Sequence, residues 1–208
     1  MLQHLIYYYC AVSDLSIIAV LYAAIRRVKG SFILKKPLLI WALFNTIAAI
    51  IGIYFDFTFR NRLPIINCCA LANFLLLTYF IIGQYQFRFK QLLLFMLSAI
   101  STILFFQNIN WQGANILIWK TLTLLTITLA LASLLRYLLS DGHKTKRIYA
   151  AMNALILVDG ISTLIYLHFI NYFIIEGMPN YQVYFPLLFA SVHFGINVFI
   201  IKISTNGK

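Results

Sequence analysis

The sequence predicts an all-α integral membrane protein that crosses the bilayer as seven helices, with its N-terminus outside and its C-terminus in the cytoplasm. Three observations predict this fold class: the apolar composition, seven apolar stretches of spanning length, and an asymmetric placement of Lys and Arg. Of the 208 residues, 62% are hydrophobic and 10% are charged, whereas soluble domains contain about half apolar and about a quarter charged residues. A soluble core of this size cannot bury so much apolar surface, so the bilayer is the expected solvent.

Seven stretches meet the requirement of about 20 mostly apolar residues for a transmembrane helix. The connections between them are short, so residues 1–208 are expected to form a single transmembrane domain. The fourth stretch is at the lower limit of spanning length, and a re-entrant segment is the alternative there. The predicted spans are approximately 3–25, 37–55, 64–84, 91–107, 114–138, 148–170 and 181–203.

The basic residues favour seven spans over six and set the orientation. With seven spans, thirteen of the sixteen Lys and Arg residues lie on one side, and such an excess is typical of the cytoplasmic side. Without the fourth span, the cluster from Lys144 to Arg147 would move to the opposite side and the asymmetry would be lost. The cytoplasmic set is Arg26, Arg27, Lys29, Lys35, Lys36, Arg88, Lys90, Arg136, Lys144, Lys146, Arg147, Lys202 and Lys208.

The formal net charge of +11 raises the question of an acidic partner. Because the charges lie in short breaks between apolar runs, we do not expect nucleic-acid binding. We expect instead that the basic loops contact anionic lipid or an acidic region of a cytoplasmic or membrane protein. Self-association is compatible with the same surface. The contact candidates are Arg26, Arg27, Lys29, Lys35, Lys36, Arg88, Lys90, Lys144, Lys146 and Arg147.

The first three and the last three spans share a layout that predicts a 3+1+3 arrangement. Each set has a basic loop, a span with a central polar residue, and an outer loop that contains a proline, Pro64 or Pro179. Parallel repeats of this kind occur in some transporters. Alternating span direction by itself produces much of this likeness, so the repeat remains one of two interpretations.

Polar residues near the middle of five spans are the candidate functional residues. Charged and polar groups at this depth are costly and require a reason. Asp14, Asp159 and His193 are the ionisable members, and we expect them to meet in a polar cavity near the middle of the bilayer. The uncharged members, Asn45, Asn73 and Asn197, are expected at the same depth.

The chemistry of this set suggests a ligand or proton site. Two carboxylates in a low-dielectric environment do not both remain charged without a partner, and His193 is the mid-membrane group that can become a cation near neutral pH. The alternative is a structural role, since Asn, Ser, Thr and His side chains often connect transmembrane helices through hydrogen bonds. For Asn45 and Asn73 helix packing is the preferred interpretation.

Sequence motifs for catalysis and for cofactor binding are missing. The chain contains no His-Glu-x-x-His, Gly-x-Ser-x-Gly or Walker A pattern. The four histidines are scattered, and Cys10, Cys68 and Cys69 lack metal-site spacing, so neither a metal nor a cofactor is expected. An enzyme is therefore not the favoured class.

These observations favour a non-enzymatic sensor, regulatory or accessory protein of a bacterial inner membrane. The Ile-, Phe-, Asn- and Lys-rich composition is typical of AT-rich bacterial genomes. A ligand, protons or lipid would act at the polar cavity, and the basic loops would pass the signal to a partner. A small transporter or channel is the alternative, and a lipid-modifying enzyme ranks third.

Overall fold

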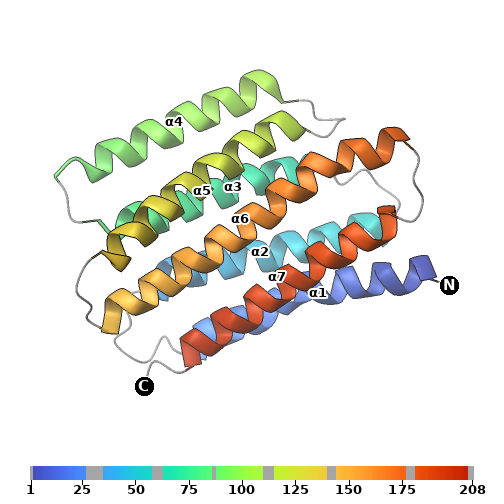
Figure 1. Cartoon of the computed structure of the whole chain (residues 1–208), viewed down its shortest axis with the longest axis horizontal. Helices are drawn as coiled ribbons and strands as arrows, with labels where there is room; N and C mark the ends of the chain where they lie inside the picture. Colours follow the sequence, from blue (N-terminus) through green and yellow to red (C-terminus); the bar gives the residue numbers. More distant parts are fainter. Residues whose placement is uncertain are drawn as a thin grey trace. The chain divides into compact units, whose positions relative to one another are not determined.

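A computed structural model describes residues 2–26, 35–57, 63–85, 88–109, 115–139, 144–176 and 181–205. Within these ranges the chain forms seven α-helices and no strand (Figure 1). The all-helical prediction is therefore confirmed for the described residues. The helices are α1 (Leu2–Arg26), α2 (Lys35–Phe57), α3 (Leu63–Gly83), α4 (Lys90–Asn108), α5 (Ile116–Leu138), α6 (Lys144–Glu176) and α7 (Tyr181–Thr205).

The helix boundaries agree with the predicted spans to within a few residues, except at α6. This helix has 33 residues, from Lys144 to Glu176, whereas the apolar stretch predicted residues 148–170. Backbone hydrogen bonds within a helix do not depend on side-chain polarity, so a helix can continue into the charged residues that flank an apolar stretch. Hydropathy therefore located the apolar part of α6 and not its ends.

Several of the basic residues assigned to loops belong to helix ends. Arg26 is the last residue of α1, Lys90 is the first of α4, and Lys144 is the first of α6. Lys35, Lys36, Lys146 and Arg147 also lie within terminal helical turns, whereas Arg88 lies in the turn before α4. Arg27 and Lys29 lie outside the described residues.

Four segments are long and apolar enough to cross a bilayer, judged by length and composition. They are Ile66–Gly83, Lys90–Asn108, Ile116–Leu138 and Tyr149–Phe169. Three shorter apolar segments lie among the described residues of the remaining helices: Ala11–Ala23, Leu39–Phe55 and Leu187–Lys202. Several helices of this kind in one chain are typical of a membrane protein.

The contacts between helices divide the chain into two compact units. The first consists of residues Met1–Ile53 and Ile161–Lys208, and the second of Tyr54–Gly160. The division falls inside α6, so this helix contributes its first half to one unit and its second half to the other. The grouping does not follow the order of helices in the sequence, because the first unit contains both ends of the chain.

In the first unit, α1 packs along α7, and the two helices run in the same direction (Figure 1). In the second unit, α3 packs against α5 and α4. A cluster of apolar side chains joins these three helices, and Phe105 of α4 is inserted into it. Its buried members are Leu71, Phe74, Phe105 and Leu122.

Many large apolar side chains are exposed, and polar side chains are buried beside apolar ones. Large apolar residues such as Phe95 and Leu117 are 71% and 79% exposed, whereas the buried residues include several Ser, Thr and Asn. Many hydroxyl groups are satisfied within their own helix, as in the 2.7 Å bond from Thr46 Oγ1 to the carbonyl oxygen of Ala42. Local bonds of this kind are expected where lipid offers no alternative partner.

Candidate functional site

The interface between α1 and α7 is formed by small and β-branched residues. Ser13, Ile17 and Val20 are buried on one face of α1, at spacings of four and three residues that place them on the same face. The Ser13 hydroxyl donates a 2.7 Å hydrogen bond to the carbonyl oxygen of Ala190 on α7. This bond between a side chain and the backbone of the neighbouring helix requires the two helices to approach closely.

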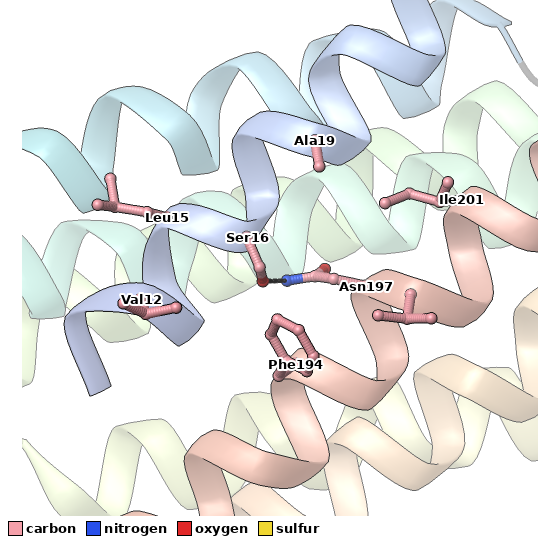
Figure 2. A pocket seen from close by; sticks show the side chains of 8 residues that line it. Val12, Leu15, Ser16, Ala19, Phe194, Asn197 and Ile201 are labelled. Atoms are coloured by element: carbon pink, nitrogen blue, oxygen red, sulfur yellow. Dashed lines mark hydrogen bonds between the residues drawn. The ribbon is translucent and has the colours of Figure 1, made fainter. Parts of the chain in front are cut away.

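A groove of about 450 Å³ lies beside this interface, between α1 and α7 (Figure 2). Its volume is within the range of small-molecule sites, about 300–1,000 Å³. Six of the eight lining residues are apolar, and Ser16 and Asn197 are polar. The lining residues are Val12, Leu15, Ser16, Ala19, Phe194, Asn197, Val198 and Ile201.

A chain of hydrogen bonds forms the polar part of the groove. Asn197 Nδ2 donates to Ser16 Oγ at 2.7 Å (Figure 2), and Ser16 Oγ donates to the carbonyl oxygen of Ser13 at 2.6 Å. The Asn197 side chain is fully buried, yet its Oδ1 atom has no hydrogen-bond partner among the described residues. Asn197 was a predicted site residue, and its partner Ser16 was not predicted.

His193 belongs to a stack of rings rather than to this groove lining. The imidazole lies 6.4 Å from the Phe189 ring at an interplanar angle of 15°, and Phe189 stacks on Tyr166 of α6 at 5.0 Å. All three residues are in the first unit. His193 is half-buried and lies one helical turn before Asn197. Its ring packs against Phe189, which is not among the residues that line the groove.

The other predicted site residues occupy different environments. Asp14 is exposed on α1, and Asp159 on α6 is half-buried and belongs to the second unit. Asn45 Nδ2 donates to the carbonyl oxygen of Trp41 on its own helix at 2.9 Å. Asn73 is half-buried. The shared cavity of Asp14, Asp159 and His193 stays a prediction.

No set of three or more His, Cys, Asp or Glu side chains within the described ranges could hold a metal ion. Cys68 and Cys69 are both free thiols on α3.

A second polar cluster, in the second unit, joins α5, α6 and the turn after α3. Asn153 Nδ2 on α6 lies 2.9 Å from Gln84 Oε1, 3.1 Å from Ser133 Oγ on α5 and 2.9 Å from the carbonyl oxygen of Tyr149. Its two hydrogens are shared among these three acceptors. The Ser133 hydroxyl also donates to Gln84 Oε1, at 3.2 Å. Ser133 and Asn153 are 0% exposed. We call Gln84, Ser133 and Asn153 the amide cluster.

Because a carbonyl oxygen only accepts hydrogen bonds, the carbonyl of Tyr149 fixes the orientation of the Asn153 amide. Nδ2 must face this carbonyl, and it then also faces Gln84, whose Oε1 must accept. Within the part of the chain that the structure describes, this leaves Gln84 Nε2 and Asn153 Oδ1 buried without partners. The amide cluster is therefore tightly connected yet incompletely satisfied.

Aromatic and basic side chains surround the amide cluster. The exposed Arg136 guanidinium lies 4.5 Å from the centre of the Tyr85 ring, within the range of a cation–π interaction. Tyr137 stacks on Tyr149 at 5.8 Å and 16°. These residues place a cation beside the ends of α3 and α5, on the side that the sequence assigns to the cytoplasm.

Sequence reasoning missed the amide cluster because it considered only residues at mid-span depth. Gln84, Ser133 and Asn153 lie near the ends of apolar stretches, where polar residues are common and carry little signal. Asn153 alone could have pointed to the cluster, because it is a polar residue between Met152 and Ala154 inside a predicted span. Its partners could not be identified from one sequence, because they are 20 and 69 positions away.

The search for relatives gives no match: no protein-family model, no curated protein and no solved structure is significantly similar to this chain.

Proposed function

We propose that this protein is a non-enzymatic membrane sensor or regulatory subunit that binds a lipid-like ligand in the groove between α1 and α7. The groove carries the proposal, because its walls are apolar and one polar pair, Ser16 and Asn197, lines it. Ligand sites commonly combine an apolar lining with a few polar groups that fix orientation. An acyl or isoprenoid chain would contact the apolar walls, and a polar head would contact the half-buried Ser16, which Asn197 holds in place.

The groove is suited to transmit a signal because it lies where two distant segments of the chain meet. A ligand shifts an equilibrium between two states when it binds one of them more tightly. A ligand that contacts both Val12 of α1 and Val198 of α7 would therefore favour one relative position of these two helices over another. The helix ends carry Arg26 and Lys202. A change in the distance between these two helix ends would alter the basic surface that a partner binds.

The proposal includes seven spans, with the N-terminus outside and the C-terminus inside a bacterial inner membrane. Its support is the concentration of Lys and Arg on one side. The basic residues would contact anionic lipid and the acidic surface of a cytoplasmic or membrane partner.

Photolabelling of the full chain in liposomes tests the groove. A fatty alcohol with a diazirine on its chain should label peptides from α1 and α7. Ala19→Trp places an indole in the groove, and we expect labelling of these peptides to fall several-fold. Ala132→Trp is the matched control, because Ala132 is an exposed alanine on α5 and is not one of the residues that line the groove. Equal labelling of all three folded proteins would refute the proposal.

Transport is the second candidate function, and the placement of polar residues along α3 and α5 favours it. The buried Asn67 precedes and the buried Thr78 follows the apolar cluster on α3, and Thr126 follows it on α5. Buried polar groups on both sides of an apolar cluster would be needed if a polar substrate passed between these helices. Substrate- or proton-driven uptake into liposomes that is lost in Asp159→Asn would support transport over sensing.

A further inference from the structure

One end of the second unit carries a cation that is held against an aromatic ring. Arg136 lies in the last turn of α5, and its guanidinium carbon is 4.5 Å from the centre of the Tyr85 ring. The backbone N–H of Tyr85 donates to the carbonyl oxygen of Ile82 at 3.0 Å, which fixes the turn after α3. The ring face makes the contact, and an arginine has five N–H donors. Donors therefore remain for an oxygen ligand.

The aromatic residues around Arg136 indicate that this end of the unit lies at the level of lipid headgroups. Tyr137 of α5 stacks on Tyr149 of α6 at 5.8 Å, and it interacts electrostatically with both Arg136 and Tyr85. Tyrosines are enriched where the apolar core of a bilayer meets its headgroups. Because Arg136 is exposed, it is able to contact a phosphate at that level.

Large exposed apolar side chains lie next to this cation in the chain. Leu138 and Leu139 follow Arg136 and are 69% and 86% exposed. Phe89, four residues after Tyr85, is 63% exposed. An anion in water would leave these side chains uncovered, whereas the acyl chains of a lipid would cover them. An exposed cation beside exposed apolar side chains therefore fits a lipid with a phosphate headgroup.

The charges at this end of the unit favour an anion. The chain has 16 Lys and Arg against five Asp and Glu, so most of its basic residues have no carboxylate of this chain to pair with. The exposed Arg88 is three residues after Tyr85, at most about 11 Å along the backbone. In addition, α6 begins at Lys144, five residues before Tyr149, and the N-terminal end of a helix attracts anions.

We propose that Arg136, held by Tyr85, binds the phosphate of an anionic glycerophospholipid. The acyl chains of this lipid lie against the three exposed apolar side chains, Phe89, Leu138 and Leu139. A guanidinium donates two parallel N–H bonds to a phosphate, which an ammonium group does not. This inference rests on the anionic-lipid contact of the proposed function and gives it a specific site, and it is independent of the groove between α1 and α7.

Lipid binding to the full chain in detergent micelles tests the site. Native mass spectrometry gives the dissociation constants of phosphatidylglycerol and of phosphatidylcholine with the same acyl chains. We expect phosphatidylglycerol to bind the wild type about tenfold more tightly, because choline brings a second cation beside Arg136. Glycerol 1-phosphate has the phosphate without the acyl chains, and it should compete with phosphatidylglycerol only at a concentration about tenfold higher or more.

Variants separate a specific site from general attraction by positive charge. Arg136→Lys keeps the charge and loses the two parallel bonds, so phosphatidylglycerol should bind about fivefold more weakly. Tyr85→Leu removes the ring and should weaken binding about two- to fivefold, whereas Tyr85→Phe keeps a ring and should bind as the wild type does. Lys120→Gln is the matched control, because it removes one charge from α5 at about 24 Å from Arg136.

Equal binding of phosphatidylglycerol by the wild type and Arg136→Lys would overturn this inference while leaving a general contact with anionic lipid. A loss in Lys120→Gln as large as that in Arg136→Lys would also overturn it, because net charge alone would then explain the effect. Competition by glycerol 1-phosphate at the same concentration as the lipid would make the ligand a free phosphate. If both phospholipids bound the wild type equally, the anionic-lipid contact of the proposed function would be wrong as well, and the groove would still be tested by photolabelling.

Discussion

Replacing Asn153 tests whether the amide cluster holds the second unit together. Asn153→Leu keeps a similar side-chain volume and removes two interhelical hydrogen bonds, to Gln84 and to Ser133. Such bonds in membrane proteins contribute about 0.6 kcal/mol each on average and at most about 1.7 kcal/mol. Because Ser133 and Gln84 also lose a buried partner, we expect the free energy of unfolding to fall by about 1–2 kcal/mol.

Asn153→Asp should be more destabilising than Asn153→Leu, although aspartate is closer in shape to asparagine. Its carboxylate would replace the amide nitrogen that faces two acceptors, the carbonyl of Tyr149 and Gln84 Oε1. The Ser133 hydroxyl and a rotated Gln84 amide would donate to the carboxylate, but the carbonyl of Tyr149 would repel it, so we expect a buried charge with incomplete partners to cost more than the bonds lost in Asn153→Leu. The order of stability, wild type above Asn153→Leu above Asn153→Asp, follows from the amide orientation.

Steric trapping in bicelles or a denaturing-detergent titration measures these free energies on the full chain. A double-mutant cycle with Gln84→Met isolates the bond between the two amides, and we expect a coupling of about 0.6 kcal/mol. Asn108→Leu is the control: Asn108 is exposed and bonds to the carbonyl of Leu104 on its own helix. If Asn153→Leu were as stable as this control, or if the coupling were zero, the reasoning would be refuted.

Three further predictions concern packing, the predicted cavity and orientation. A Cβ added at Gly160 would lie 2.7 Å from Cγ1 of the Ile127 side chain, so Gly160→Ala should lower the free energy of unfolding by about 1–3 kcal/mol. Gly195→Ala is the control, because a Cβ there meets no described atom within 4 Å, and it should leave the free energy of unfolding unchanged. Equal stability of the two variants would contradict this packing. If Asp14, Asp159 and His193 form one site, Asp14→Asn, Asp159→Asn and His193→Ala should each abolish ligand-dependent signalling while membrane insertion remains; full signalling in all three variants would exclude the shared cavity. Labelling of cysteines in tags at the two chain ends should place these ends on opposite sides of the membrane. If both ends were labelled from the same side, the prediction of seven spans would be wrong.

Of the six predicted site residues, Asn197 is the one that lines the groove between α1 and α7. Asn197 was predicted and lines the groove, and its partner Ser16 was overlooked because a serine in a transmembrane helix carries little signal. The expectation of a site built from Asp14, Asp159 and His193 came from depth along each span. Depth alone does not say which way a side chain points, and Asp14 is exposed on α1 whereas its neighbour Ser13 is buried.

The sequence by itself determined where the helices are, because a membrane-spanning helix satisfies its own backbone and needs only a local run of apolar residues. The tertiary structure alone decided which face of each helix meets another helix. In a soluble protein the apolar face identifies the core, but lipid is as apolar as a leucine side chain, so exposed Phe95 and Leu117 cost little. The interior is instead selected by close packing and by polar groups that need partners, as Asn153 and Asn197 do, and those partners come from segments distant in the chain.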